Sequence, residues 1–328
     1  HPWQWLTLPC NPIAWPMWAD AGRRDLDFDV IHATAFPYAF PIACGLRLAR
    51  RLRVPFVLTP FLHLGDPGNL RDPVRRQYTT PALISLIRAA DCVLVQTMGE
   101  KQLLEKQGIA PEKLVLQGLG VDPDECTGGD RTEIRRKWGV QPGEVVAGHL
   151  ANNSREKGTI DLLQAASRIW DQGGALRVVL AGPEMPNFQS FWKRFATRGR
   201  VLRLGVLDAR EKQNFFAGID LFALPSRSDS FGLVLLEAWA NGLPNIAYRA
   251  GGIADVVRDG QDGLLVPCGN INALVEGLTR LLADSELRTR LGQAGKERLP
   301  RDFRWEDKLQ KVRDVYERLV RIRKNSKH

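Results

Sequence analysis

The chain has 328 residues, of which 44% are hydrophobic and 25% charged, and its formal net charge is +9. This composition is typical of a globular protein and excludes a disordered or fibrous chain, while the length suits one large domain or two ordinary ones. No segment reaches the roughly 18 uninterrupted apolar residues of a membrane-spanning helix, and the first residues lack the layout of a signal peptide. We therefore expect a cytoplasmic protein.

The positive charge is unevenly distributed along the chain. Residues 1–126 are balanced in charge, so the whole excess lies in residues 127–328. This asymmetry indicates an anionic partner for the second half, such as phosphate, an anionic membrane surface or nucleic acid. Charge is the only feature that fits nucleic acid, so we expect no nucleic-acid partner.

The cysteines are scattered and form no C-x-x-C pair, so neither a disulfide framework nor a zinc site is indicated. No metal is predicted. We expect reduced, mostly buried thiols at Cys10, Cys44, Cys92, Cys126 and Cys268.

The opening segment combines tryptophans with prolines, and this proline density argues against a regular helix. Two interpretations are open. The indoles pack irregularly on the first domain, or they form an aromatic platform or interfacial anchor for a sugar or lipid acceptor. The tryptophans concerned are Trp3, Trp5, Trp15 and Trp18.

From residue 29 the pattern alternates between strand and helix. The runs DVIHA, PFVLTPF, ADCVLVQT and KLVLQGLGV are strand-like, and PIACGLRLARRL, RDPVRRQYTTPALISLIRAA and MGEKQLLEKQG are helical. This alternation predicts a parallel sheet covered by helices. A polar, turn-rich segment over residues 122–130 interrupts it, so we place the end of the first domain at residue 126.

The second half repeats the theme and predicts a doubly wound α/β domain over residues 127–304. Its strand-like runs are EVVAGHL, ALRVVLAGP, RVLRLGV, LFALPS, PNIAYR and GLLVP. Residues 305–328 predict one basic amphipathic helix. We expect this helix to pack across the domain junction, and a membrane-surface role is the alternative.

The segment SRSDSFGLVLLE, residues 226–237, carries the clearest chemical signal. Ser230 is placed to cap a helix that begins near Phe231 and Gly232, and free N–H groups at a helix start bind phosphate. Asp229 and Glu237 are too far apart to share a proton, and their spacing suits a nucleotide sugar. The alternative is a capped helix with ordinary surface acids.

With GGIADVV and DGLLV downstream, this segment resembles the donor-site signature of the GT4 family of retaining glycosyltransferases. The family motif has two glutamates separated by seven residues; Asp229 stands at the first position and Glu237 matches the second. Similar segments over nearly the whole chain are DVIH, ADCVLVQT, EKLVLQGLGVD, EKGT, LAGP and RDFRWED.

The resemblance implies an α/β GT-B fold, with two Rossmann-like parallel-sheet domains that face a cleft. Family members usually begin with a strand, a glycine-rich loop and a helix, and nothing in this sequence matches that opening. Either residues are missing from this sequence or the first domain is naturally short, and in both cases we expect a shortened, incomplete first domain.

The resemblance also implies a reaction. A hexose would pass from a nucleotide-diphosphate sugar to an acceptor hydroxyl with retention, without metal or cofactor and without a dedicated protein base. A UDP-sugar is favoured over a GDP-sugar. The acceptor would be a saccharide or lipid-linked, in cell-envelope polysaccharide or glycoconjugate synthesis, with the protein cytoplasmic or peripheral at the inner membrane face. The alternative is a nucleotide-sugar-binding protein or partner subunit with little turnover. A nicotinamide dehydrogenase lacks its strand-linked G-x-G-x-x-G.

The residues that would hold the diphosphate follow from the same resemblance. Lys157 matches the family lysine that neutralises the phosphates. His149, after Gly148, stands where an arginine is usual, and Arg155 is the candidate substitute because a guanidinium binds phosphate as a bidentate fork.

The remaining roles concern the sugar, the ribose and the base. Asp229 would contact the hexose and Glu237 the ribose. His63 would face the transferred sugar, which makes it a catalytic candidate together with Asp229 and Lys157, whereas His32 lines the cleft or supports the sheet. The backbone near the donor would come from Val206, Leu207, Ser230, Phe231, Gly232 and Leu233.

Overall fold

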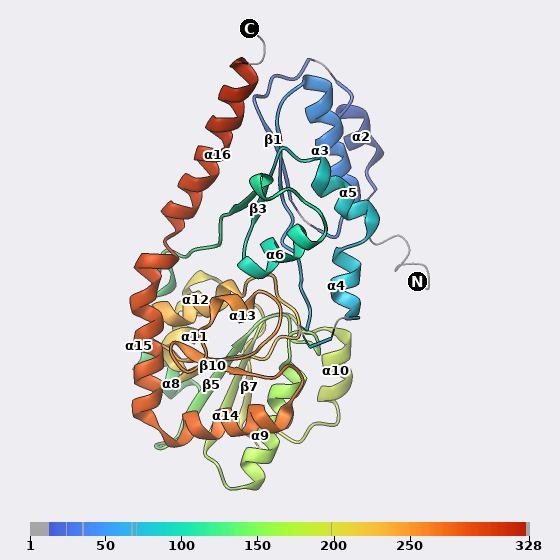
Figure 1. Cartoon of the computed structure of the whole chain (residues 1–328). Coiled ribbons are helices and arrows are strands. Elements are labelled where there is room, and N and C mark those ends of the chain that lie inside the picture. The colour runs from blue at the N-terminus through green and yellow to red at the C-terminus, as the bar shows by residue number, and fades with distance from the viewer. Residues whose placement is uncertain are drawn as a thin grey trace. The chain divides into compact units, whose positions relative to one another are not determined.

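The computed structural model describes residues 13–23, 25–34, 36–66, 68–69, 71–197 and 199–325. The chain divides into two compact units (Figure 1). Unit 1 comprises His1–Gly65, Asn69–Leu119 and Glu306–His328, and unit 2 comprises Asp66–Gly68 and Gly120–Trp305. Each unit contains one parallel sheet, so the predicted α/β class is confirmed.

Unit 1 is built on a four-stranded parallel sheet in the order β1-β2-β3-β4. The strands are β1 (Ile31–Thr34), β2 (Phe56–Thr59), β3 (Cys92–Val95) and β4 (Leu114–Leu116), and Ile31 pairs with Phe56. β2 and β3 are buried along their whole length, because helices cover both faces of the sheet.

The two faces of this sheet are covered by different helices. On one face lie α3 (Ala39–Leu52), α5 (Pro81–Ala89) and α6 (Met98–Lys106), whose apolar residues share a core with the strands. On the other face, α16 (Trp305–Asn325) packs Val312, Val315, Tyr316 and Leu319 against Val57 and Leu94. The apolar stripe of this C-terminal helix covers the sheet of unit 1.

Unit 2 is built on a six-stranded parallel sheet in the order β10-β9-β8-β5-β6-β7. All six strands coincide with runs predicted from the sequence, and Val145 pairs with Leu176. The strands are β5 (Val145–Leu150), β6 (Leu176–Ala181), β7 (Val201–Arg203), β8 (Leu221–Leu224), β9 (Asn245–Tyr248) and β10 (Gly263–Val266).

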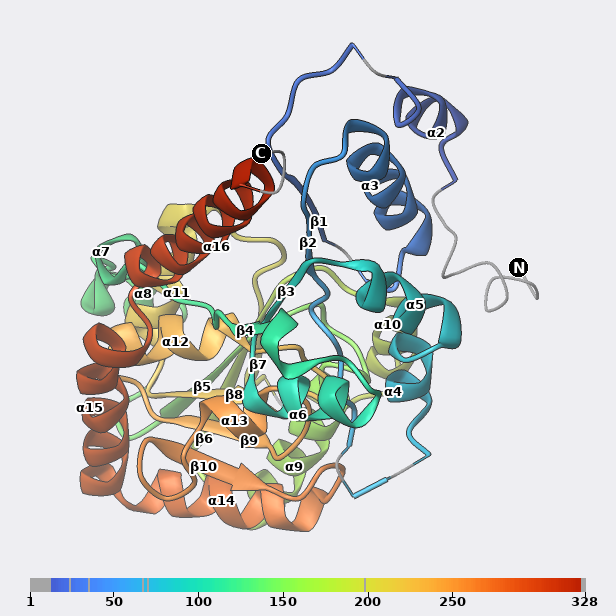
Figure 2. The ribbon, with the colours of Figure 1, turned by 45° about the horizontal axis from the view of Figure 1, so that its top comes forward.

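Helices lie on both faces of this second sheet (Figures 1 and 2). α9 (Thr159–Asp171) and α14 (Ile271–Ala283) lie side by side on one face, and α11 (Ala209–Gly218) and α12 (Leu233–Ala240) lie on the other. The remaining helices of the unit are α7 (Pro123–Cys126), α8 (Arg131–Lys137), α10 (Pro186–Trp192), α13 (Ile253–Val256) and α15 (Ser285–Asp302).

The strand order of unit 2 reverses direction at β5. The chain runs outward from β5 through β6 to β7, then returns to β8 on the opposite side of β5. Ligands of open α/β sheets bind at such a reversal, beyond the carboxyl ends of the strands. We therefore expect a ligand-binding site in the loops after β5 and β8.

Two local predictions were wrong. Residues 15–20 form the short helix α2 (Trp15–Asp20), because Pro16 stands in its first turn, where a missing N–H costs nothing. The single helix predicted over residues 71–90 is two helices, α4 (Pro73–Tyr78) and α5. The side chain of Thr80 accepts a hydrogen bond from Leu83 N and Pro81 follows it, so a new helix begins there.

Among the described residues, the cysteines Cys44, Cys92, Cys126 and Cys268 are free, as expected; Cys10, Trp3 and Trp5 lie outside that part of the chain. No helix in the described ranges is long and apolar enough to cross a membrane.

A buried arginine joins α15 to the rest of unit 2. Arg298 Nη1 donates to Val256 O at 2.7 Å and to Asp262 Oδ2 at 2.8 Å, and Nε donates to Asp302 Oδ2 at 2.7 Å. Its guanidinium also lies 4.9 Å from the centre of the Phe303 ring. Burial raises the pKa of Asp262, and the arginine opposes that shift.

We predict that Arg298→Met lowers the free energy of unfolding by about 3 kcal/mol or more, because it leaves a buried carboxylate without its charged partner. Urea unfolding followed by circular dichroism measures the loss. Arg301→Met, at an exposed position of the same helix, is the matched control. A loss no larger than that of the control would contradict the prediction.

Candidate functional site

The loops after β5 and β8 are joined by direct contacts. Lys157 Nζ lies 2.7 Å from Asp229 Oδ2. The backbone N–H of Arg227 donates to Glu156 O at 2.9 Å, and Ser226 Oγ lies 3.4 Å from the same oxygen. The strand reversal thus brings together Lys157 and Asp229, which the sequence placed 72 residues apart.

Asp229, and not Ser230, bonds the backbone of the turn that leads into α12. Its Oδ1 accepts hydrogen bonds from the N–H groups of Phe231 at 3.3 Å and Gly232 at 2.9 Å. The helix begins at Leu233, with Gly232 as an N-cap that has no side-chain hydrogen bond. The prediction of a Ser230 cap was therefore wrong: a carboxylate reaches amides two and three residues ahead, and it holds two of the N–H groups expected to be free.

Two glycines allow these loops to approach closely. Gly158 has φ +76°, and a Cβ there would lie 1.8 Å from Pro225 O in the loop after β8. Gly251 has φ +55°, and a Cβ there would lie 2.2 Å from Asp229 O. Glycine tolerates both the positive φ and the close backbone contact. Gly158 of the KG pair and Gly251 of the GG pair therefore shape the site, because they carry no side chain.

His149 is fully buried at the end of β5 and anchors the loop after β5, which carries Lys157. Its Nδ1–H donates to Ala223 O at 2.8 Å, and its Nε2 accepts from the Thr159 hydroxyl at 2.9 Å. Thr159 Oγ1 in turn accepts from Ser154 N at 3.1 Å. Burial lowers the pKa of His149 to about 4, so the ring is neutral near pH 7. It supplies no charge for phosphate from this position.

Arg155 and Lys157 are the cations of the loop after β5. Arg155 is exposed, and its backbone N–H donates to Asn187 Oδ1 at 3.3 Å, while the Lys157 N–H donates to Ser154 Oγ at 3.0 Å. The backbone of the loop is thus fixed, whereas the Arg155 guanidinium makes no hydrogen bond or ion pair with the described ranges of the chain.

A second buried network holds the loop after β8. Arg227 Nη2 lies 2.5 Å from Asp161 Oδ2, and the Tyr248 hydroxyl donates to the same oxygen at 2.9 Å. Burial, followed by the charge of Asp161, raises the pKa of Tyr248. The phenol therefore stays protonated and donates, which fixes the start of the loop that carries Asp229.

A pocket of about 610 Å³ lies beside the start of α12. Glu237 and Leu233 reach it from α12, and Lys212 reaches it from α11. Lys212 Nζ donates to Glu237 Oε1 at 2.8 Å. The rest of the lining comes from Gly120, Val121, Asp122, Glu125, Cys126, Ala209, Gln213 and Trp305. A carboxylate held by one lysine, with its second oxygen available, is suited to accept hydrogen bonds from vicinal hydroxyls.

Of the other predicted donor residues of unit 2, Val206 and Leu207 lie just before α11, whereas Gly148 and Phe231 are buried. Val206 is 73% exposed and, with Leu207, immediately precedes the capping box of Asp208 and Glu211 that starts α11. Gly148 is buried, and a Cβ there would lie 2.6 Å from the Ile219 side chain, so it serves packing inside the sheet. Phe231 is buried with its ring 6.1 Å from that of Phe303.

In unit 1, His63 follows β2 and stacks on Tyr78 with 4.8 Å between the ring centres. Phe61, two residues earlier, has φ 51°, a left-handed conformation that is strained for a bulky residue. The buried Glu100 carboxyl accepts from Leu62 N at 3.0 Å and Gln96 N at 2.6 Å, and burial raises its pKa to about 7. These contacts hold the segment that carries His63.

His32 supports the structure of unit 1. Its Nδ1 lies 2.6 Å from the Tyr316 hydroxyl of α16, and its Nε2 lies 2.7 Å from Thr59 Oγ1 of β2. Burial lowers its pKa. The sequence left two roles open for His32, lining the cleft or supporting the sheet. Its contacts with Tyr316 and Thr59 favour support of the sheet.

Sequence reasoning missed Lys212 and Arg227. Both act through ion pairs with distant acids, and neither belongs to a local motif, so no pattern in the sequence identifies them. In the described ranges no cluster of three or more histidine, cysteine, aspartate or glutamate residues could hold a metal ion.

Two family models match the chain. Residues 130–298 match "Glycosyl transferases group 1", which is more than half of the chain, and residues 2–120 match "Glycosyl transferase 4-like domain". The first match contains every candidate donor residue of unit 2, from Gly148 to Glu237.

Characterised relatives are similar over most of the chain. N-acetyl-alpha-D-glucosaminyl L-malate synthase of Bacillus anthracis is 33% identical over 317 residues, which cover 94% of this chain and 79% of that protein. D-inositol 3-phosphate glycosyltransferase of Corynebacterium glutamicum is 29% identical over 309 residues, which cover 90% of this chain and 73% of that protein.

Solved structures show the same fold. Sucrose-phosphate synthase from Thermosynechococcus elongatus has a TM-score of 0.78 and 22% identity over 98% of this chain and 80% of its own. HepE of Anabaena in complex with UDP and glucose has a TM-score of 0.73 and 21% identity over 88% and 78%. The chain has the GT-B fold. It belongs to the GT4 family, glycosyl transferases group 1, and transfers a sugar from a nucleotide sugar.

Proposed function

We propose that the chain transfers a hexose from a UDP-sugar to a hydroxyl of a saccharide or lipid-linked acceptor, with retention at the anomeric carbon. The observation that carries the proposal is the contact between Lys157 and Asp229 at the strand reversal, beside a pocket that contains Glu237. Solved structures of HepE with UDP-glucose, and a GT4 relative named for N-acetylglucosaminyl transfer, support the choice of donor class.

In this proposal the diphosphate lies over the loop after β5. Lys157 neutralises one phosphate, and Arg155 supplies the second cation, because its guanidinium is exposed on the same loop and His149 is neutral. The first N–H groups of α12, from Leu233 onward, form the positive end of the helix dipole, and we place the phosphates in front of them. Asp229 holds Lys157 and the Phe231 and Gly232 amides in place and accepts from hydroxyls of the hexose.

The nucleoside occupies the pocket in unit 2. Glu237 accepts hydrogen bonds from the ribose hydroxyls, and Lys212 fixes the orientation of that carboxylate. The base lies near the backbone of Val206 and Leu207, which leads into α11. Burial raises the pKa of Cys126 to about 11, so the thiol in the pocket lining is neutral and does not repel the nucleotide.

The reaction follows from this binding. The bond between the anomeric carbon and the phosphate oxygen breaks as the acceptor oxygen attacks the same face, and the departing phosphate takes the acceptor's proton. Cationic groups at the phosphates stabilise the charge that develops on the leaving group. We assign His63 to a hydrogen bond with the transferred sugar.

We place the activity in the synthesis of cell-envelope polysaccharide or another glycoconjugate. Relatives of this chain include an enzyme named for lipopolysaccharide core biosynthesis in Rhizobium meliloti, 28% identical over 225 residues. This placement rests on the relative and on the family.

Incubation of the purified chain with UDP-glucose, UDP-N-acetylglucosamine or a GDP-sugar, each with a panel of saccharide and lipid-linked acceptors and a chelator, tests the proposal. Proton NMR would follow UDP release and the anomeric configuration of the product. We expect UDP release with an α-configured product from the α-configured donor. A β-configured product, or release from GDP-sugars alone, would contradict the proposal.

We predict that Lys157→Met weakens UDP binding by about tenfold or more and leaves uridine binding unchanged, because a charge-assisted contact to phosphate is lost. Calorimetry with both ligands measures the two affinities. Lys193→Met, exposed elsewhere in unit 2, controls for the lost charge. Equal weakening of uridine and UDP would show that Lys157 does not act at the phosphates.

Glu237→Gln should weaken uridine and UDP by the same factor, about tenfold, since the ribose hydroxyls are common to both ligands. The same calorimetric titrations measure it, and Glu276→Gln on the exposed side of α14 is the control. A loss confined to UDP would be incompatible with a ribose role.

Because His149 is buried and neutral, the free energy of unfolding of the chain should depend on pH. Its pKa is lower in the folded protein than in the unfolded chain, so the unfolded chain binds the extra proton first on acidification. The stability advantage of the wild-type chain over His149→Gln should fall by up to about 3 kcal/mol between pH 6.5 and pH 4. Urea unfolding at several pH values measures both proteins. A difference that stays constant with pH would refute the burial of a neutral ring.

A further inference from the structure

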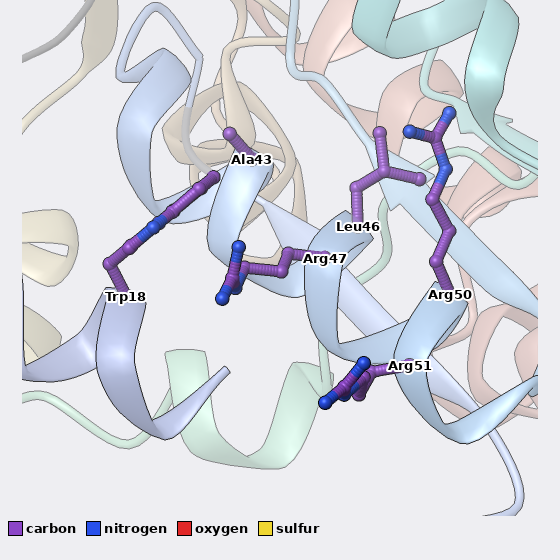
Figure 3. A pocket seen from close by; sticks show the side chains of 6 residues that line it. All are labelled: Trp18, Ala43, Leu46, Arg47, Arg50 and Arg51. Atoms are coloured by element: carbon purple, nitrogen blue, oxygen red, sulfur yellow. The ribbon is translucent and has the colours of Figure 1, made fainter. Parts of the chain in front are cut away.

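A pocket of about 560 Å³ lies between α2 and α3 in unit 1, and its described lining contains none of the residues assigned to the donor (Figure 3). Trp18 reaches it from α2, and α3 contributes the rest of its described lining. Those residues are Ala43, Leu46, Arg47, Arg50 and Arg51. Three of the six lining side chains are arginines, so the pocket is strongly cationic.

The arginines are exposed and are not neutralised. Arg47, Arg50 and Arg51 make no ion pair with a carboxylate in the described part of the chain. Two of them are held in place: the Arg47 guanidinium lies 4.6 Å from the centre of the Trp18 ring, and Arg51 Nε donates to Gly22 O at 3.2 Å. Figure 3 shows Arg47 of α3 and Trp18 of α2 pointing toward one another.

Large apolar side chains are exposed next to this cationic pocket. Ile13 is 51% exposed, Trp15 is 69% exposed and Met17 is 46% exposed. Trp15 packs one edge against Phe40 of α3, with 6.0 Å between the ring centres, so the helix is fixed on α3 while much of the indole stays outside the core. Exposed apolar groups beside unpaired arginines fit a partner that is both anionic and apolar.

The basic helix α16 does not offer this combination. Its residues Val312, Val315, Tyr316 and Leu319 pack against the sheet of unit 1, so the apolar stripe is already covered. α16 also exposes Trp305, Leu309 and Ile322, but these side chains are spread from the first turn of the helix to its last. Ile13, Trp15 and Met17 lie close together in the sequence, which favours α2 and α3 over α16 for contact with lipid.

We propose that the surface formed by α2 and α3 binds an anionic phospholipid bilayer. Arg47, Arg50 and Arg51 contact headgroup phosphates, since guanidinium groups bind phosphate as bidentate forks. Ile13, Trp15 and Met17 enter the boundary between headgroups and acyl chains, where tryptophan is favoured. Neither the arginines nor the apolar side chains alone give stable attachment, and together they hold the protein at the membrane. The proposal does not depend on the donor assignment.

Co-sedimentation with lipid vesicles, without nucleotide sugar, tests the proposal with the full chain. Vesicles of phosphatidylcholine alone are compared with vesicles that contain phosphatidylglycerol, at low and high salt. We expect binding to the anionic vesicles only, weakened by salt. The variant R47Q/R50Q/R51Q should lose at least about tenfold in partition coefficient, and Trp15→Ala should lose a few-fold.

The control variant is R313Q/R321Q/K324Q, which removes the same charge from α16. It should bind anionic vesicles as the wild type does. Circular dichroism and the thermal midpoint establish that each variant is folded. Equal binding to neutral vesicles, or a loss confined to the α16 variant, would overturn the proposal. Thermal stabilisation by inorganic phosphate without vesicle binding would identify a site for soluble phosphate and would likewise overturn the assignment to lipid.

Discussion

The reversal of strand order between β5 and β8 positions the residues of the proposed donor site. It places the carboxyl ends of two neighbouring strands side by side, so that Lys157 of one loop meets Asp229 of the other at 2.7 Å. The contact is possible only because Gly158 and Gly251 let the backbones approach to distances that any Cβ would block. The sheet decides where the charges meet, and the glycines decide how closely.

Buried polar groups then hold those loops in one geometry. His149 joins the end of β5 to Thr159, and Asp161 joins α9 to Arg227 and Tyr248. Each of these side chains has a hydrogen-bond partner inside unit 2, although Arg227 Nε has none in the described part of the chain. Burial keeps His149 neutral and Tyr248 protonated. Such networks are rigid because a lost partner leaves a desolvated polar group unsatisfied. The positions that carry no charge for the donor therefore still determine where Lys157 and Asp229 lie.

The two parallel sheets could be predicted from the sequence, because their strands are short β-branched runs that alternate with helical segments. The family could be predicted from motifs, and the same motifs suggest the roles that we propose for Lys157 and Glu237. The start of α12 could not be predicted, because Ser230 and Asp229 are both good capping residues, whereas in the structure Gly232 is the N-cap and Asp229 bonds the amides just before the helix. Lys212 and Arg227 act through partners 25 and 66 residues away, which no local pattern reveals. The arginines of α3 are visible in the sequence, but their pocket with Trp18 exists only once α2 has folded against α3.

A crystal structure of the chain with UDP, grown in the presence of a chelator, would locate the nucleotide in unit 2. We expect a diphosphate within hydrogen-bond distance of Lys157 Nζ and a ribose whose hydroxyls contact Glu237. UDP bound elsewhere in the chain, or ribose and phosphate in the opposite orientation, would contradict this expectation.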